Sequence, residues 1–379
     1  MKIEQVRWSE SAGWHPHPPG RLSAPAQLVL LFGSTPILRA HQQFAEIARA
    51  YPAAHRAGCS TAGEICGTRV TDDSLVVTAL HFEHTRVQGA QVNVADCASS
   101  LQAGERLAVA LDPQGLVHVL VISDGIKVNG SELVRGMLKR LPKGVQVTGG
   151  LSGDGARFQQ TVVFVDSPPE EGRIAALGFY GDRLKVGYGS LGGWDPFGPE
   201  RLITRSSGNV LYELDGQSAL GLYKRYLGDA ATGLPATGLL FPLSLRTGEN
   251  GRGVVRTILA VNEDEQTMTF AGDVPEGAYA RLMKANFDRL VDGAHGAAQT
   301  SYEAIGSAPP ELAILISCVG RKLVLKQRTE EEVEAVRSVL GEQAVLAGFY
   351  SYGEICPAAP NASCELHNQT MTITTFAER

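Results

Sequence analysis

The chain has 379 residues, with 34 Lys and Arg against 40 Asp and Glu, which gives a formal net charge of -6. At about 150 residues per domain, this length predicts two or three domains with a sizeable core. The mild acidity and the lack of any Lys/Arg run remove the electrostatic footprint that nucleic acid or an anionic membrane surface needs, so we expect neither partner.

The N-terminal stretch Met1–Trp14 has no apolar leader region. The longest apolar runs, Leu28–Phe32 and Leu312–Ile316, are far shorter than the roughly 20 residues of a membrane span. We therefore expect a cytoplasmic protein without membrane insertion. Six cysteines in so long a chain, with no C-x2-C pair, are expected to be reduced thiols.

The first predicted elements form a unit that recurs. An apolar run at 27–33 predicts a strand, and 37–50 has apolar residues at helical spacing. A glycine-bounded loop, Gly58–Cys66, and a strand at 74–82 complete the unit.

The same order appears twice more. In the second unit, a strand at 116–122 is followed by a helix at 131–141, the loop Gly149–Gly155 and a strand at 161–165. In the third unit, a strand at 312–316 precedes Thr329-Glu-Glu-Glu332, which predicts a helix capping box. The loop Gly348–Cys356 and a strand at 371–376 then follow.

The first and third loops share the tetrapeptide Gly-Glu-Ile-Cys, each with another glycine five residues earlier. Repeated strand, helix, glycine loop and strand units predict an α/β fold with mixed sheets and two related halves. In the rest of the chain, roughly 181–302, strands are expected at 253–261 and 267–270, with helices near 219–227 and 278–291. The boundary is placed at residue 206, after an N-terminal extension over 1–26 and a first domain over 27–205; the second domain is 206–379.

The loops also suggest a binding chemistry. Glycines allow backbone amides to converge on an anionic group, while Glu64, Asp154 and Glu354 beside them are able to receive an amine. Together these groups suit a zwitterion. The alternative, which the sequence leaves open, is that the glycines only shape tight turns and the carboxylates cap backbone amides.

These motifs in this order resemble the FIST family, with its N and C domains in tandem. The resemblance rests on Gly58-Cys-Ser-Thr-Ala-Gly-Glu-Ile65, Ser123-Asp-Gly125, Gly149–Gly155, Ser317-Cys-Val-Gly-Arg321, and Gly348–Ile355 with His367-Asn-Gln-Thr370. It implies a sensory input protein that binds a small ligand and signals in trans to a partner such as a histidine kinase, because the two domains use nearly the whole chain. The predicted ligand-binding residues are Cys59, Ser60, Gly63, Glu64, Ser152, Gly153, Asp154, Arg321, Tyr352, Gly353, Glu354, His367 and Asn368.

Two other functions remain open. A subset of the family binds haem and senses nitric oxide, which makes haem b a possible cofactor, although none is required; the candidate ligands here are His367, Cys356, His81 and His84. Cys59 in its loop also allows a thiol-dependent enzyme, provided that a histidine base lies within hydrogen-bond reach. Since no catalytic triad or phosphate-binding loop is complete, we do not expect an enzyme.

Overall fold

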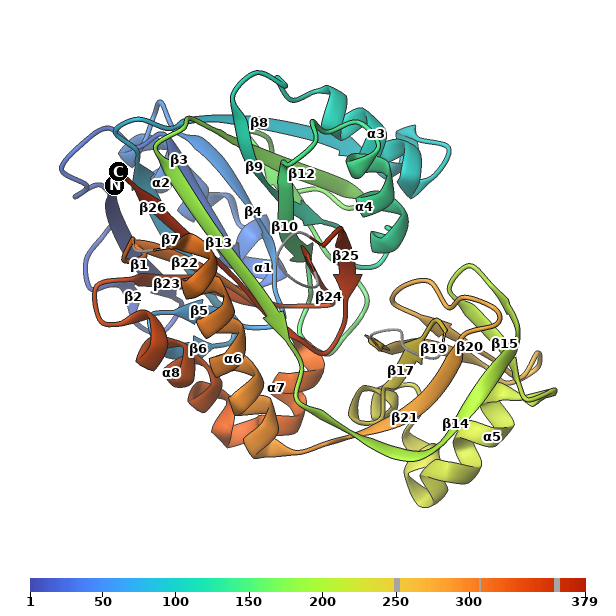
Figure 1. The fold of residues 1–379 in the computed structure, drawn as a ribbon. Helices are drawn as coiled ribbons and strands as arrows, with labels where there is room; N and C mark the ends of the chain where they lie inside the picture. Colours follow the sequence, from blue (N-terminus) through green and yellow to red (C-terminus); the bar gives the residue numbers. More distant parts are fainter. Residues whose placement is uncertain (249–252, 307, 358–361) are drawn as a thin grey trace.

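The structure is a computed structural model that describes residues 1–248, 253–306, 308–357 and 362–379. Its main body contains three six-stranded mixed sheets, and a smaller β module is attached on one side (Figure 1). The predicted α/β fold with mixed sheets and repeated units is confirmed.

Each sheet is built around one of the three repeats. Two parallel strands are joined by a helical segment, and a third strand lies antiparallel beside the first. These strands are β3 (Leu28–Gly33), β4 (His55–Ser60) and β7 (Ser74–His81) in the first sheet, β9 (Leu116–Ser123), β10 (Gln146–Leu151) and β12 (Arg173–Tyr180) in the second, and β22 (Leu312–Cys318), β23 (Val345–Ser351) and β26 (Met371–Glu378) in the third.

After its second strand, each repeat crosses into a neighbouring sheet. The short strand β5 (Glu64–Cys66) pairs with β23, β11 (Val163–Val165) pairs with β4, and β24 (Gly353–Pro357) pairs with β10. Two further strands extend these edges, β6 (Arg69–Thr71) and β25 (Cys364–His367). Every sheet therefore contains a strand from another repeat.

After each of the first two repeats, a fourth strand also joins another sheet, in the direction opposite to that taken by the short strands. β8 (Arg86–Asn93) pairs with β12 of the second sheet, and β13 (Leu184–Leu191) pairs with β26 of the third. In the first sheet, β1 (Lys2–Ser9) takes this place beside β7 and pairs with β2 (Gly13–His15). Residues 1–26, expected as an extension, thus contribute two strands to the body.

The three sheets enclose one apolar core and carry helices on their outer faces. Because side chains alternate along a strand, Leu30 and Phe32 of β3 face the inner core while Val29 and Leu31 pack outward under helices. The outer elements are α1 (Thr35–Arg39) and α2 (His41–Ala50) on the first sheet, α3 (Ser100–Val109), preceded by η1 (Val94–Asp96), and α4 (Gly130–Leu138) on the second, and α6 (Phe287–Ile305), α7 (Val319–Leu325), η4 (Lys326–Arg328) and α8 (Thr329–Leu340) on the third. Within the described ranges, no helix combines the length and the apolar character needed to cross a bilayer.

The attached module, which we call the insert, comprises residues 194–285 and has its own core. It lies between β13 and α6, whereas in the first repeat β8 reaches α3 through η1 alone. Its elements are β14 (Trp194–Ser207), β15 (Val210–Leu214), β16 (Gln217–Ser218), α5 (Ala219–Leu227), η2 (Gly228–Gly233), η3 (Ala236–Leu240), β17 (Leu243–Arg246), β18 (Val254–Arg256), β19 (Ile258–Asn262), β20 (Thr267–Phe270) and β21 (Tyr279–Ala285). The boundary predicted at residue 206 falls within β14.

Two local predictions were wrong. Residues 279–285, expected as helix, form β21, because this segment pairs with both β14 and β17 and tertiary pairing overrides the helical pattern. The capping box at Thr329 is also absent: the N-cap residue is Arg328, and the Thr329 hydroxyl donates to Lys326 O. Glu332, expected to cap the helix, instead turns into the core.

Candidate functional site

The three glycine loops meet in a closed ring, which we call the hub. Ala62 N–H donates to Tyr350 O over 2.8 Å, Tyr352 N–H to Leu151 O over 3.0 Å, and Gly153 N–H to Ser60 O over 3.0 Å. Each loop donates one such bond to the next, so the ring follows the exchange of strands between the sheets. The loops that the sequence singled out are therefore brought together.

Glu64 and Glu354 make matching hydrogen bonds at equivalent places in the hub. Glu64 accepts from the Thr61 hydroxyl at 2.5 Å and from the amide and hydroxyl of Ser74. Burial raises the pKa of Glu64 to about 7, against the lowering effect of these bonds.

Glu354 repeats this pattern. It accepts from Ser351 Oγ at 2.6 Å and from the amide and hydroxyl of Thr370. Burial raises the pKa of Glu354 to about 8. Each carboxyl therefore links a glycine loop to the start of the third strand of its own repeat.

Asp154 organises the remaining loop of the hub. Its oxygens accept from the amides of Phe158, Gln159 and Gln160 at 2.8 to 2.9 Å. The Tyr352 hydroxyl donates to Asp154, and the Tyr352 ring stacks on Phe158 with centroids 4.2 Å apart. Asp154 and Tyr352 thus hold the loop that follows β10.

The neighbouring polar side chains of the hub are also engaged within the protein. Ser60 Oγ accepts from Val162 N at 2.9 Å, whereas Ser152 Oγ is buried without a described partner. Gly63 and Gly353 lie in the first and third loops of the hub. The side chains around these two glycines are buried. As ligand contacts, these residues stay a prediction, and the geometry favours a structural role.

Arg321, predicted as a ligand contact, is fully buried in the body. Its guanidinium lies 2.8 Å from Glu332, and it donates to Gly192 O and Leu290 O at 2.8 and 2.6 Å. Glu332 also accepts from Ser317 and Tyr350. The guanidinium predicted to bind a ligand is therefore paired with a carboxylate of the protein itself, which the sequence could not reveal because Glu332 was assigned to a helix cap.

Cys59 faces the inner apolar core and is fully buried. Burial raises the pKa of its thiol well above the ordinary value, which disfavours the thiolate that a nucleophile needs. This geometry does not support the thiol-dependent enzyme.

The four haem candidates all have contacts within the protein, and haem binding stays a prediction. His367 Nε2 lies 2.9 Å from Cys356 O, and Cys356 is fully buried with a raised pKa. His81 Nδ1 lies 2.8 Å from Pro25 O, and His84 Nε2 lies 2.8 Å from Arg183 Nη1. Among the described residues, no three His, Cys, Asp or Glu side chains are grouped to hold a metal ion.

The segment His367–Thr370 joins the body to the insert. Asn368 donates to Tyr352 O and accepts from Thr257 N, each at 3.4 Å. The side-chain amide of Gln369 donates to Leu239 O at 3.0 Å and to Thr257 Oγ1 at 3.1 Å. The backbone carbonyl of Gln369 accepts from Trp194 Nε1. His367 and Asn368 were predicted from the sequence as ligand contacts, whereas Gln369 of the same motif was not.

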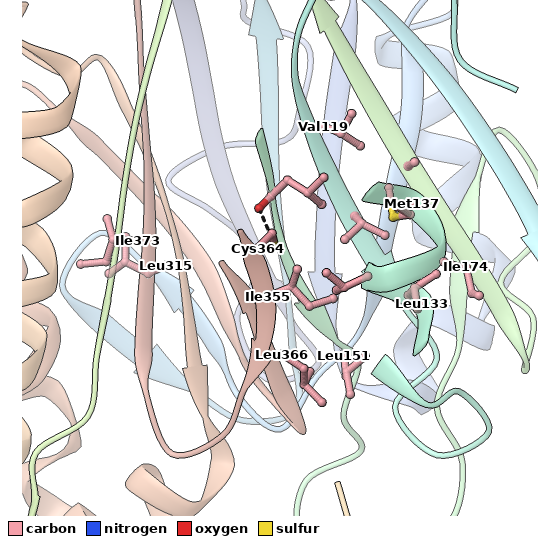
Figure 2. Close-up of a cluster of buried hydrophobic side chains, with 14 of the residues drawn as sticks. Val119, Leu133, Met137, Leu151, Ile174, Leu315, Ile355, Cys364, Leu366 and Ile373 are labelled. Carbon is pink, nitrogen blue, oxygen red and sulfur yellow. Dashed lines mark hydrogen bonds between the residues drawn. The ribbon is translucent and has the colours of Figure 1, made fainter. Parts of the chain in front are cut away.

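Beside this segment, a cleft of about 320 Å³ lies between body and insert. Its body wall comes from α4 and β25, and its insert wall from β17, β18 and the residues after β20. Figure 2 shows the apolar packing behind the body wall, where Leu366 and Cys364 lie with Leu133, Leu151 and Ile355. The lining residues are Ser131, Val134, Arg135, Leu245, Thr247, Val254, Arg256, Asp273, Pro275, Cys364, Glu365 and Leu366.

The sequence analysis predicted none of these lining residues as ligand contacts. They come from three distant stretches of the chain, so neither a motif nor a spacing connects them. Arg256 is the most buried charged group among them, at 7% exposure, and burial lowers its pKa to about 10.

The cleft lies at the junction of the mixed α/β body and the inserted β module, a place where small-ligand sites often occur. The FIST N domain matches residues 27–217 and the FIST C domain matches residues 219–357. The chain belongs to the FIST family, whose domains are sensory domains of signal transduction that bind small ligands.

The other comparisons add no function. No curated protein sequence matches the chain. Among solved structures, cyanuric acid hydrolase from A. caulinodans is 10% identical, with a TM-score of 0.20, and the match covers 78% of this chain and 99% of that one. A second cyanuric acid hydrolase structure is 11% identical with a TM-score of 0.18, covering 78% of this chain and 100% of the other. At this level of similarity, neither structure supports a conclusion about the function of this chain.

Proposed function

We propose that this protein is a sensory input protein that binds its small ligand in the cleft between body and insert. The observation that carries this proposal is the composition of the cleft. Ser131 and Arg135 belong to the segment that matches FIST N, whereas Val254, Arg256 and Asp273 belong to the segment that matches FIST C. A ligand held there contacts both family domains.

This placement differs from the sequence expectation, in which the ligand lay between the glycine loops. The hub loops are closed by hydrogen bonds to one another, and their carboxyl groups already hold protein donors. The cleft, in contrast, is open and combines apolar walls with a few polar groups, as ligand sites generally do.

Ligand binding at a junction of two bodies gives a direct route to signalling. A ligand that contacts both sides favours the arrangement of the insert in which those contacts are best, and shifts the population toward it. The signal then passes in trans to a partner such as a histidine kinase; this part of the proposal rests on the family resemblance.

The test is a thermal-shift screen of small metabolites against the wild type and two variants. Val254→Trp fills the cleft, and Val109→Trp makes the same change at a residue on α3 that is 70% exposed. We expect a ligand to raise the melting temperature of the wild type and V109W but not of V254W, because binding to the native state alone stabilises it. Equal shifts in all three proteins, or none with a broad panel, would contradict the proposal.

A further inference from the structure

Arg256 carries a buried charge that makes no direct ion pair with a carboxylate of the described residues; Glu365 and Asp273 act on it only from a longer distance. Its Nη1 donates to Leu366 O at 2.9 Å and to Val255 O at 3.3 Å, and its Nε donates to Asp273 O at 3.2 Å; all three acceptors are backbone carbonyls. No Asp or Glu of the described chain lies within ion-pairing distance of this guanidinium. Charged groups are rarely buried without a counter-charge, because removing a charge from water is costly.

The contrast with Arg321 makes this unusual. Arg321 is also buried, but Glu332 lies 2.8 Å from it and completes an ion pair. In the cleft itself, Asp273 is paired with Arg135 over 2.6 Å and also accepts from Asn129. Asp273, one of the two acids that act on the Arg256 charge, is therefore already engaged by another cation.

The free part of the guanidinium reaches the cleft. Nη2 makes no hydrogen bond to a described residue, yet it is not among the side-chain nitrogens that are sealed from solvent without a partner. Since Arg256 lines the cleft, this nitrogen is accessible from it. Gly272 leaves room for the arrangement, because a Cβ there would lie 2.9 Å from Arg256 Nε.

The residues around Arg256 restrict the type of anion that the cleft can bind. Val134, Leu245, Val254 and Leu366 provide apolar walls, while Asp273 and Glu365 place negative charge nearby. Those acids repel a dianionic phosphate more strongly than a single carboxylate. A planar carboxylate also matches the planar donors of a guanidinium.

We propose that the ligand of the cleft carries a carboxylate that binds to Arg256. This inference rests on the proposed function and specifies the chemical class of the ligand. The carboxylate supplies the direct ion-pair partner that Arg256 lacks, and the remainder of the molecule lies against the apolar walls.

The experiment compares matched pairs of probes by isothermal titration calorimetry. The probes are straight-chain mono- and dicarboxylates, the carboxamide of each, and inorganic phosphate. The proteins are the wild type, Arg256→Met, the cleft-filled V254W, and Arg140→Met as a matched change on the exposed surface, where Arg140 pairs with Glu105.

We expect at least one carboxylate to bind to the wild type and to R140M, with the matching carboxamide at least tenfold weaker. R256M should weaken carboxylate binding ten- to a hundredfold. Because Arg256 donates to three backbone carbonyls, R256M is first checked by circular dichroism; if it fails to fold, the carboxylate-to-carboxamide ratio in the wild type decides alone.

The outcomes separate this inference from the proposed function. Carboxamides that bind as well as carboxylates, phosphate in place of carboxylates, or binding unaffected in R256M would each overturn the inference. In those cases, binding that V254W abolishes leaves the proposed function standing. If no probe binds to the wild type, the carboxylate assignment fails, and the metabolite screen with V254W then decides the proposed function.

Discussion

Glu64 and Glu354 show how one residue type serves the same purpose in two repeats. Both are buried, and both accept one hydroxyl from their own loop and two donors from the strand that follows. Three donors suit an ionised carboxylate, whereas burial favours the neutral acid. Burial wins in both cases, because the pKa values are raised to about 7 and about 8.

The raised pKa predicts that stability depends on pH through Glu64. An unfolded glutamate titrates near pH 4.5, so the contribution of Glu64 to stability is fully present below that value. It is lost as the pH rises to the folded pKa of about 7. In Glu64→Gln, which does not titrate, we expect the loss of unfolding free energy between pH 5 and pH 8 to be smaller by about 2 to 3 kcal/mol. Urea unfolding of both proteins at pH 5 and pH 8 measures this difference in unfolding free energy.

Glu342→Gln provides the matched control, because Glu342 is exposed on the turn after α8. This variant should follow the wild-type pH dependence. If E64Q also follows it, the carboxyl of Glu64 does not titrate in the expected window, and its role as a buried neutral acid is rejected.

The thiols allow a second test at the scale of residues. Cys59 is fully buried, whereas Cys66 and Cys97 are partly exposed; burial raises the pKa of both Cys59 and Cys66. With iodoacetamide, we expect native protein to be alkylated only at Cys66 and Cys97, and Cys59 only after unfolding in urea. Peptide mass spectrometry locates the modified sites. Rapid alkylation of native Cys59 would restore the thiol-dependent enzyme as a hypothesis.

The residues of the hub were predictable, but the cleft was not. Gly-Glu-Ile-Cys occurs twice, and repetition alone pointed to Glu64 and Glu354. Arg256 gives no such signal, because an arginine in a short strand is ordinarily exposed and only the docking of the insert on β25 buries it.

At the scale of elements, the segment between β25 and β26 is the main polar connection between hub and insert. Thr370 donates to Glu354 in the hub, while Gln369 donates to two residues of the insert. Gln369 also has a φ of 64°, a conformation that residues other than glycine rarely adopt. Thr257, its partner, directly follows Arg256, so this segment lies between the cleft and the hub.

Gln369→Ala should therefore loosen the insert without unfolding the body. Alanine keeps the Cβ, so the backbone requirement at this position is unchanged while two hydrogen bonds are lost. We expect the local stability of the insert to fall by about 1 to 3 kcal/mol. The loss is limited because Gln369 Oε1 is buried without a described partner in the wild type.

Hydrogen exchange followed by mass spectrometry tests this expectation. Exchange should accelerate in β17, β18 and η3 but not in β3, β9 or β22. Gln343→Ala, at an exposed position, is the matched control. Acceleration spread evenly over body and insert would show that Gln369 supports the whole fold rather than the junction.

Elements with a local signal were predictable, and those that depend on distant partners were not. The apolar runs of β3, β9 and β22 are long enough to be read as buried strands. The short strands β5, β11 and β24 pair with other repeats, so their own three to five residues carry little information. β21 was read as a helix for the same reason, since its two partners lie in β14 and β17.

At the scale of the whole molecule, the three repeats form a closed cycle. The fourth strands β8 and β13 pass from the first repeat to the second sheet and from the second repeat to the third. β1 fills the corresponding place in the first sheet, although it comes from the other end of the chain. The ends meet there: the Met1 amine lies 2.8 Å from Glu311 and 3.8 Å from Glu378 at the end of β26.

This cycle predicts that the chain tolerates circular permutation between repeats. Residue 379 is joined to Met1 through a Gly/Ser linker of about six residues, and new ends are made between Gln114 and Gly115. That site is exposed and lies between α3 and β9, so every strand and every hub bond is kept. We expect a melting temperature within about 5 °C of the parent, measured by circular dichroism.

A second permutant, opened between Ile126 and Lys127, tests whether the location of the break matters. This break lies inside the second repeat, where Asp124 accepts from both of those amides and also from Gly172. It should melt well below the first permutant, because three charge-assisted bonds to one carboxylate are disturbed. If both permutants unfold alike, the repeats do not act as the units of the cycle. If both are as stable as the parent, the contacts within a repeat contribute no more than the joints between repeats.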